Sequence, residues 1–170
     1  MVAELPPNEN MVIEDREIPG PEDAPSVGVR IYRPKAASGV LPGIFFIHGG
    51  GMIMGSVEGE NLKATKLCEA IQAVVVSVEY RLAPEHPHPA PVQDCYAALK
   101  WMAKNADDLA FDPNRLAVVG GSAGGGLTIA TTMMARDKGF PRICFQMPLY
   151  PMIDDRHETP SSYEIMDVGI

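Results

Sequence analysis

The sequence predicts an α/β protein with one mostly parallel β-sheet and an antiparallel pair of strands at its N-terminal side. Two observations support this class. Four short apolar runs lack the alternation of apolar and polar residues, which is typical of strands covered on both faces by helices. Helix-like segments separate these runs, and a chain in which strand and helix alternate folds as an α/β sheet with right-handed crossovers.

The N-terminal pair comes first. Val27, Val29 and Ile31 fall on one face of the stretch VGVRIYRP, and Arg30 and Tyr32 fall on the other, as in a strand with one face in water. The stretch NMVIEDREI precedes it, and the turn residues PGPEDAPS lie between the two. We therefore expect these two stretches to pair in antiparallel fashion.

The remaining elements follow in order. Buried strands are predicted at GIFFI, VVVSV, LAVV and ICFQ, and helices at NLKATKLCEAI, APVQDCYAALKWMAKNA and AGGGLTIATTMMARDK. The second helix carries an apolar stripe made by Val92, Cys95, Tyr96, Leu99 and Ala103. The third helix is apolar nearly all round until Arg136, so we expect it to be a buried helix.

Length and charge limit the classes of function. The chain has 170 residues without a repeat or linker, so we expect residues 1–170 to form a single domain. The net charge of −8 does not attract nucleic acid or an anionic membrane, because both demand clustered Lys and Arg. No apolar run approaches the roughly 20 residues that span a bilayer, and the acidic N-terminal stretch has no secretory-signal core.

The three cysteines, Cys68, Cys95 and Cys144, form an odd number and have no metal-ligand spacing. Each has apolar neighbours in the sequence. We predict that they are reduced thiols in the core of a cytoplasmic protein.

A serine follows the third buried run directly and begins a helix. The residues Gly120-Gly121-Ser122-Ala123-Gly124 fit the pattern G-x-S-x-G. Such a tight turn raises the hydroxyl above the carboxyl edge of the sheet, where the helix N-terminus favours a developing oxyanion. An N-cap without catalytic function is the alternative for this serine.

A second glycine cluster, HGGG at residues 48–51, follows the first buried run. Alone it fits a plain turn or a phosphate cradle. Together the two clusters predict acyl-transfer chemistry, because successive glycines can direct their N–H groups toward one point beside the serine. Neither the dinucleotide pattern G-x-G-x-x-G nor a P-loop can be laid on GGSAGGG, so we expect no cofactor.

Several blocks in order resemble the hormone-sensitive-lipase-like group of α/β-hydrolases, which includes bacterial carboxylesterases: HGGGM, EYRLAPEHPHPAP, DPNRLAVVGGSAGGG and LYPMIDDRHETPSS. The resemblance implies Ser122 as nucleophile and an oxyanion hole made by the backbone N–H groups of Gly50, Gly51 and Ala123. It implies a serine carboxylesterase acting on small, short-chain esters through an acyl-enzyme. Many relatives carry an acidic residue where this chain has Gly121.

The same resemblance makes the proline-rich loop structural, so we expect no metal at Glu85, His86 and His88. We expect Glu79 and Arg81 to form a structural ion pair near this loop.

The base for Ser122 is harder to find. The family order is Ser, then Asp or Glu, then His, and only His157 follows Ser122. Asp154 and Asp155 precede it on one local segment, but the resemblance places the triad acid and imidazole beyond two further strands. Whether Asp154, Asp155 or His157 replaces them stays open.

By this resemblance the chain is the N-terminal portion of such an esterase and lacks the last strands and the usual cap. The apolar edge at Ile143–Tyr150 then needs cover, from a homodimer or from a C-terminal segment. Two alternatives to an esterase remain: a non-catalytic binding module of the same fold, and an inactive truncated product.

Overall fold

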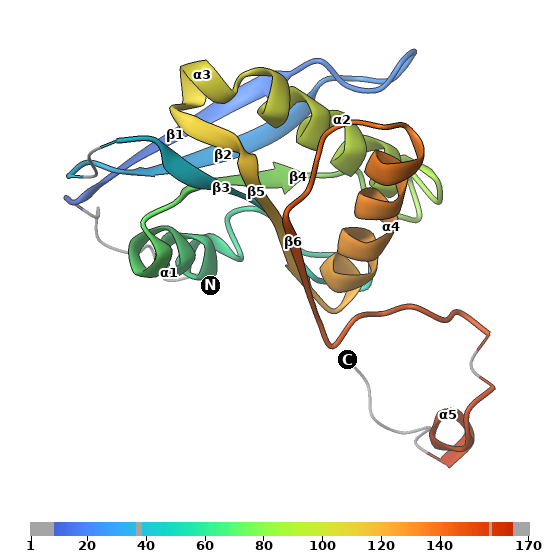
Figure 1. Cartoon of the computed structure of the whole chain (residues 1–170). Helices are drawn as coiled ribbons and strands as arrows, with labels where there is room; N and C mark the ends of the chain where they lie inside the picture. Colours follow the sequence, from blue (N-terminus) through green and yellow to red (C-terminus); the bar gives the residue numbers. More distant parts are fainter. Residues whose placement is uncertain (1–8, 37–38, 157, 165–170) are drawn as a thin grey trace.

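The computed structural model describes residues 9–36, 39–156 and 158–164. One six-stranded sheet runs through the molecule in the order β1-β2-β4-β3-β5-β6 (Figure 1). Its strands are β1 (Met11–Ile18), β2 (Val27–Pro34), β3 (Leu41–Ile47), β4 (Val74–Glu79), β5 (Phe111–Gly121) and β6 (Phe145–Leu149).

The pairing confirms the predicted sheet. β1 pairs antiparallel with β2 from Met11 opposite Pro34 to Ile18 opposite Val27. β2 joins the central sheet through an antiparallel pairing with β4, and β3, β4, β5 and β6 are parallel to one another. The carboxyl ends of β3 and β5, which carry the two glycine clusters, therefore lie side by side, with Ile47 opposite Gly120.

Side chains of the central strands alternate between two cores, one on each face of the sheet. Phe45 and Ile47 of β3 belong to the larger core, and Ile44 and Phe46 belong to the smaller one. Both faces are apolar because helices cover both of them, which explains the unbroken apolar runs in the sequence.

Helices complete the layers. α1 (Asn61–Ile71) covers the smaller core, while α2 (Ala90–Lys104), the short α3 (Ala106–Leu109) and α4 (Ala123–Asp137) cover the larger one. The predicted second helix ends at Lys104, because Asn105 leaves the helical conformation and bonds back to Trp101. α5 (Pro160–Glu164) lies away from the sheet (Figure 1). No described helix has the length and apolar character that crossing a bilayer requires.

α4 differs from the prediction. Its buried side includes Leu127, Thr128 and Thr131, whereas Met133 on the other side is 47% exposed. The expectation of a helix buried all round is wrong because α4 packs on β5 and β6, where the sheet ends, and no described element covers its outer side.

The cysteines are free, and two of them are in the core as expected. Burial raises the pKa of Cys68 to about 12 and raises the pKa of Cys95 well above its ordinary value, so both remain thiols. The core setting predicted for Cys144 is wrong. Cys144 is exposed because it lies just before β6, on the unpaired edge of the sheet.

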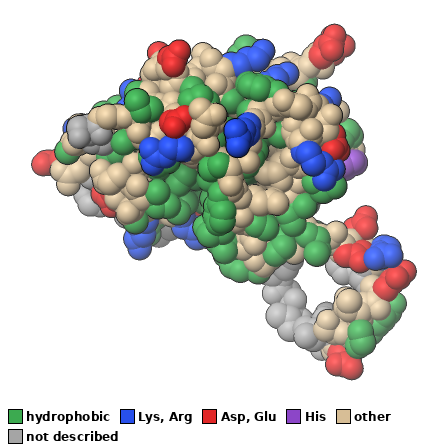
Figure 2. Space-filling view, in the orientation of Figure 1, with side chains coloured by type: hydrophobic (Ala, Val, Ile, Leu, Met, Phe, Trp, Pro, Cys, Tyr) green, Lys and Arg blue, Asp and Glu red, His purple; other side chains and the backbone are tan. Residues whose placement is uncertain are grey.

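The two edges of the sheet have different surfaces. At the β1 edge, Arg16 pairs with Glu14 and Asp108, and Arg30 of β2 pairs with Asp15. At the β6 edge, Phe145 is 58% exposed and hydrophobic side chains gather over the strand (Figure 2). Charged edges resist strand pairing and apolar edges favour it.

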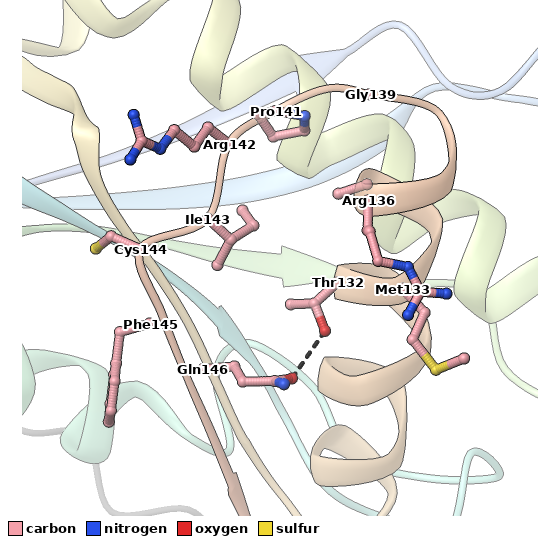
Figure 3. Close-up of a pocket in the computed structure, with 11 residues that line it drawn as sticks. Thr132, Met133, Arg136, Gly139, Pro141, Arg142, Ile143, Cys144, Phe145 and Gln146 are labelled. Carbon is pink, nitrogen blue, oxygen red and sulfur yellow. Dashed lines mark hydrogen bonds between the residues drawn. The ribbon is translucent and has the colours of Figure 1, made fainter.

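A groove of about 580 Å³ follows the β6 edge on its α4 side (Figure 3). Thr132 of α4 donates a hydrogen bond to Gln146 of β6 across it, and Ile143, Arg136 and Arg142 line it. The groove is a separate surface from the Ser122 cavity described below.

Candidate active site

Ser122 lies at the turn between β5 and α4, with φ 56° and ψ −119°. Side chains rarely adopt this backbone conformation, which costs on the order of 1–3 kcal/mol and is found mostly at functional sites. The turn leaves Ser122 exposed, above the carboxyl end of a buried strand.

Neighbouring backbone holds Ser122 in this conformation. Its N–H donates to the carbonyl of Leu149 at 3.0 Å. Its own carbonyl accepts from the N–H of Met152 at 2.9 Å and from the N–H of Gly126 at 3.1 Å. The segment 149–152 therefore contacts both polar backbone groups of Ser122 and offsets part of the cost of its strained turn.

The glycines around Ser122 allow close approach of backbone. A Cβ on Gly124 would lie 2.2 Å from the carbonyl oxygen of Ile47, and a Cβ on Gly120 would lie 2.3 Å from that of Gly124. Only glycine lets the start of α4 pack directly on the end of β3 at this distance.

The HGGG cluster forms a loop after β3 with left-handed backbone at Gly50 (φ 117°), Gly51 (φ 64°) and Met52 (φ 64°). The carbonyl of Gly50 accepts the N–H groups of Ile53 and Met54 at 3.1 and 3.0 Å. In the described part of the chain, the N–H groups of Gly50, Gly51 and Ala123 donate to no acceptor. They are therefore free to bind a developing oxyanion.

His48, which is fully buried, stabilises this loop. Its Nδ1 lies 2.8 Å from the carbonyl oxygen of Gly49, to which it donates, and its ring stacks on Tyr80 at 4.2 Å. Burial raises the pKa of Tyr80, and its protonated hydroxyl donates to the His48 carbonyl at 3.0 Å. The His48 ring is therefore part of the support of the loop.

The structure brings the two glycine clusters together at one cavity of about 320 Å³. Gly49, Gly50, Gly121 and Ser122 line it. A Cβ on Gly49 would lie 3.0 Å from the Gly121 carbonyl oxygen and 3.6 Å from Ser122 Cβ, so the loop and the serine are neighbours. Gly51 and Ala123 are adjacent in the chain to lining residues.

The cavity has no imidazole among its described lining residues. His88 lines another groove, of about 470 Å³, together with Asp154 and Asp155. Asp154 accepts from Arg156 at 2.6 Å. His157 lies outside the described residues.

Two residues of the EYRLAPE block have partners that differ from the expectation. Arg81 pairs with the fully buried Asp94 of α2 at 2.7 Å, and not with Glu79. Glu79 instead accepts the N–H of Val57 at 2.8 Å. The predicted pair is wrong because β4 ends at Glu79, and beyond the strand both the backbone N–H and the guanidinium of Arg81 donate to Asp94.

Sequence reasoning missed four polar side chains of the Ser122 cavity: Tyr150, Ser56, Glu60 and Lys63. Lys63 pairs with Glu60 at 2.8 Å at the start of α1. The signal for Tyr150 is its position directly after β6, at the same carboxyl edge of the sheet as the glycine clusters. Glu60 and Lys63 have no such signal.

Comparison with known proteins gives a consistent set of relatives. A family model described as alpha/beta hydrolase fold matches residues 44–168. Carboxylesterase NlhH of Mycobacterium tuberculosis is 40% identical over 158 residues, which are 93% of this chain and 49% of that protein. Arylesterase of Saccharolobus solfataricus is 37% identical over 142 residues, covering 83% of this chain and 42% of the relative.

Among solved structures, a bacterial heroin esterase superposes with a TM-score of 0.91 at 39% identity, covering 95% of this chain and 51% of that one. An esterase of Pyrobaculum calidifontis superposes with a TM-score of 0.78 at 45% identity, covering 83% of this chain and 44% of that one. The chain thus spans about half the length of these relatives. On the family match and the fold, the chain belongs to the alpha/beta hydrolase fold family.

Proposed function

We propose that the chain carries the nucleophile and oxyanion half of a serine carboxylesterase for small, short-chain esters. Ser122 is the nucleophile, and the N–H groups of Gly50, Gly51 and Ala123 form the oxyanion hole. One observation carries this proposal: an exposed serine in a strained strand-to-helix turn shares a cavity with a loop in which the N–H groups of Gly50 and Gly51 have no partner in the described chain. Hydrolase relatives named as esterases support the reaction class.

The chemistry has two steps. The Ser122 oxygen attacks the ester carbonyl carbon, the carbonyl oxygen becomes negative in the oxyanion hole, and the alcohol leaves with the serine proton. Water then attacks the acyl-enzyme, releases the carboxylic acid and returns the proton to Ser122. Both steps need an imidazole to carry the proton and a carboxylate to orient it.

We extend the proposal to the source of this imidazole. No described residue of the Ser122 cavity supplies it, so the triad acid and histidine come from polypeptide outside the described residues. His157, a C-terminal segment and a second copy of the chain are the candidates. If a C-terminal segment or a second copy supplies the imidazole, residues 1–170 alone are a single, catalytically incomplete domain, and we expect them to turn over esters orders of magnitude more slowly than a complete triad does.

The β6 edge is a second reason to propose that further polypeptide packs on this domain. Its apolar side chains and unpaired backbone are covered by a C-terminal segment or by a homodimer. Sedimentation at increasing protein concentration separates the two: a dimer that Phe145→Lys dissociates supports self-pairing. A monomer at all concentrations leaves the C-terminal segment as the cover.

We place the esterase in the cytoplasm, because three free thiols suit a reducing compartment. A nonreducing peptide map that recovers any cysteine pair joined by a disulfide contradicts this location.

A non-catalytic binding module is the second candidate. The lack of an imidazole among the described residues of the Ser122 cavity favours it. In that case the same cavity binds a small ester or acid without forming a covalent bond to Ser122.

The test supplies the missing base. Because Ser122 is exposed, free imidazole can reach it, and we expect added imidazole to accelerate labelling by a fluorophosphonate. Peptide mass spectrometry should find the label on Ser122 and none in the Ser122→Ala variant. Label on another residue, or no acceleration by imidazole at Ser122, contradicts the nucleophile and favours the binding module.

A further inference from the structure

The residue directly after β6, Tyr150, has an unusual backbone. Its φ is +36°, which a bulky residue rarely adopts, and it is held there by the hydrogen bonds that Leu149 and Met152 make to Ser122. Strained residues that the surrounding structure holds in place cluster at ligand-binding positions. Tyr150 lines the Ser122 cavity.

The Tyr150 ring covers Gly121. A Cβ on Gly121 would lie 3.2 Å from Cε2, 3.2 Å from the hydroxyl oxygen and 3.4 Å from Cζ of Tyr150. The glycine that precedes the serine therefore leaves the space into which this ring packs. The phenol of Tyr150 fills that space.

The phenol and the glycine loop meet different atoms of Gly121, the residue that precedes Ser122. The loop approaches the carbonyl oxygen of Gly121 through Gly49, whereas Tyr150 lies over the position of the missing Gly121 side chain. On the proposed function, Gly50 and Gly51 bind the reacting carbonyl, which leaves the phenol free for another atom of the substrate. Tyr150 meets another part of the same ester.

The Tyr150 hydroxyl is available to that ester. The side chain is 73% exposed, and its hydroxyl has no hydrogen-bond partner among the described residues. A phenol hydroxyl both donates and accepts hydrogen bonds. It adds to the cavity one polar group that the oxyanion donors do not use.

We propose that Tyr150 is a specificity-determining residue that hydrogen-bonds a polar atom of the ester other than the reacting carbonyl. The ligand class is a small ester with an ether, hydroxyl or second carbonyl oxygen in its acyl or alcohol part. This inference rests on the proposed function of the Ser122 cavity.

The experiment measures ester binding without turnover, in the Ser122→Ala background, by ligand-detected NMR. Two isosteric pairs separate the acyl from the alcohol part: methyl 3-methoxypropanoate against methyl pentanoate, and 2-methoxyethyl acetate against butyl acetate. We expect one ether ester to bind roughly threefold to tenfold more tightly relative to its hydrocarbon partner, which is the size of one net hydrogen bond.

Tyr150→Phe should abolish this preference and leave the hydrocarbon ester unchanged, because only the hydroxyl is lost. Tyr163→Phe, at an exposed tyrosine of α5 that does not line the cavity, is the matched control and should change nothing. Gly121→Ala should also reduce the preference, since the new Cβ pushes the ring by a few tenths of an ångström.

A preference that persists in Tyr150→Phe overturns the inference, and so does a chain that binds none of the four esters. These outcomes are separate from the labelling test. Phosphonate on Ser122 with no Tyr150 effect leaves the esterase proposal intact, and a Tyr150-dependent preference without labelling leaves a binding site that is not catalytic.

Discussion

The two glycine-rich turns at the carboxyl edge of the sheet have similar composition and different physical needs. After β3, Gly50 and Gly51 are required for their left-handed backbone, and a Cβ on Gly51 would meet nothing closer than 3.6 Å. Around β5 and α4, Gly120 and Gly124 have ordinary backbone but lie against other backbone atoms at 2.3 and 2.2 Å from a would-be Cβ. Gly51 therefore needs the conformational freedom of glycine and Gly120 and Gly124 need its small size, whereas Gly50 needs both.

This difference teaches where each turn can tolerate change. A strained backbone conformation lowers the free energy of unfolding by roughly 1–3 kcal/mol, and the strain can relax locally. A contact between two backbones cannot relax unless a helix moves away from a strand, because interiors are close-packed. The serine turn should therefore be the less tolerant of the two.

The largest expected effect tests the contact between backbones. Gly124→Ala should lower the free energy of unfolding by about 3 kcal/mol, because α4 must move from β3 and overpacking outweighs the better helix propensity of alanine. Urea unfolding measures it. Gly59→Ala is the control, because its Cβ would make only ordinary contacts, from 3.4 Å outward. Equal effects at both positions would refute the distinction.

The next largest effect is expected at Gly50, which needs both the left-handed backbone and the absence of a side chain. Gly50 has φ 117°, and a Cβ there would lie 2.0 Å from the carbonyl oxygen of Met54. We expect Gly50→Ala to cost about 2 kcal/mol of unfolding free energy. The turn must open, so imidazole-assisted labelling of Ser122 should fall by roughly 10²–10³-fold, as on loss of an oxyanion donor. Unchanged labelling in a folded variant would remove Gly50 from the oxyanion hole.

A smaller effect tests the strain at the serine itself. Ser122→Gly should be about 1 kcal/mol more stable than Ser122→Ala, since glycine adopts φ 56° and ψ −119° without strain but loses more chain entropy. Both variants lack the nucleophile, so the comparison isolates the backbone. Thermal unfolding of the pair measures it, and an alanine variant that is the more stable would show that the turn is unstrained.

The smallest effect is expected at Gly51. Gly51→Ala should cost about 1 kcal/mol or less, because an alanine pays only for the left-handed backbone. Gly139→Ala is the matched control, with φ 69° and nothing within 4 Å of its would-be Cβ. Calorimetry should find similar losses in the two variants. A much larger loss at Gly51 would mean that its turn also needs the small size of glycine.

Much of the fold could be predicted because its signals are local. The apolar runs GIFFI, VVVSV and LAVV correspond to strands in the interior of the sheet, whereas the buried strand expected at ICFQ is wrong, because β6 is a partly exposed edge strand. α1 begins and ends where its pattern does, at Asn61 and Ile71. The bounds of the strands were predicted less well than their existence. β5 begins at Phe111, five residues before the apolar run LAVV, because Phe111 pairs with Leu41 of β3.

The candidate site was likewise predictable only where its signals are local in the sequence. Ser122 and the HGGG cluster were identified from short motifs, since a strand end, glycines and a helix start are adjacent in sequence. The contacts of Tyr150 with Gly121 and of Leu149 and Met152 with Ser122 join segments almost 30 residues apart, and no local pattern reports them.

By itself, the sequence determined the alternation of strand and helix, the position of the serine turn and the presence of a loop able to offer free N–H groups. Only the tertiary structure decided that Arg81 pairs with Asp94, that Cys144 and Met133 are exposed, and that a phenol lies beside the nucleophile. The physical reason is that periodicity and turn chemistry act between near neighbours in the chain. Partners and exposure depend on the order of strands in the sheet and on which elements cover its edges.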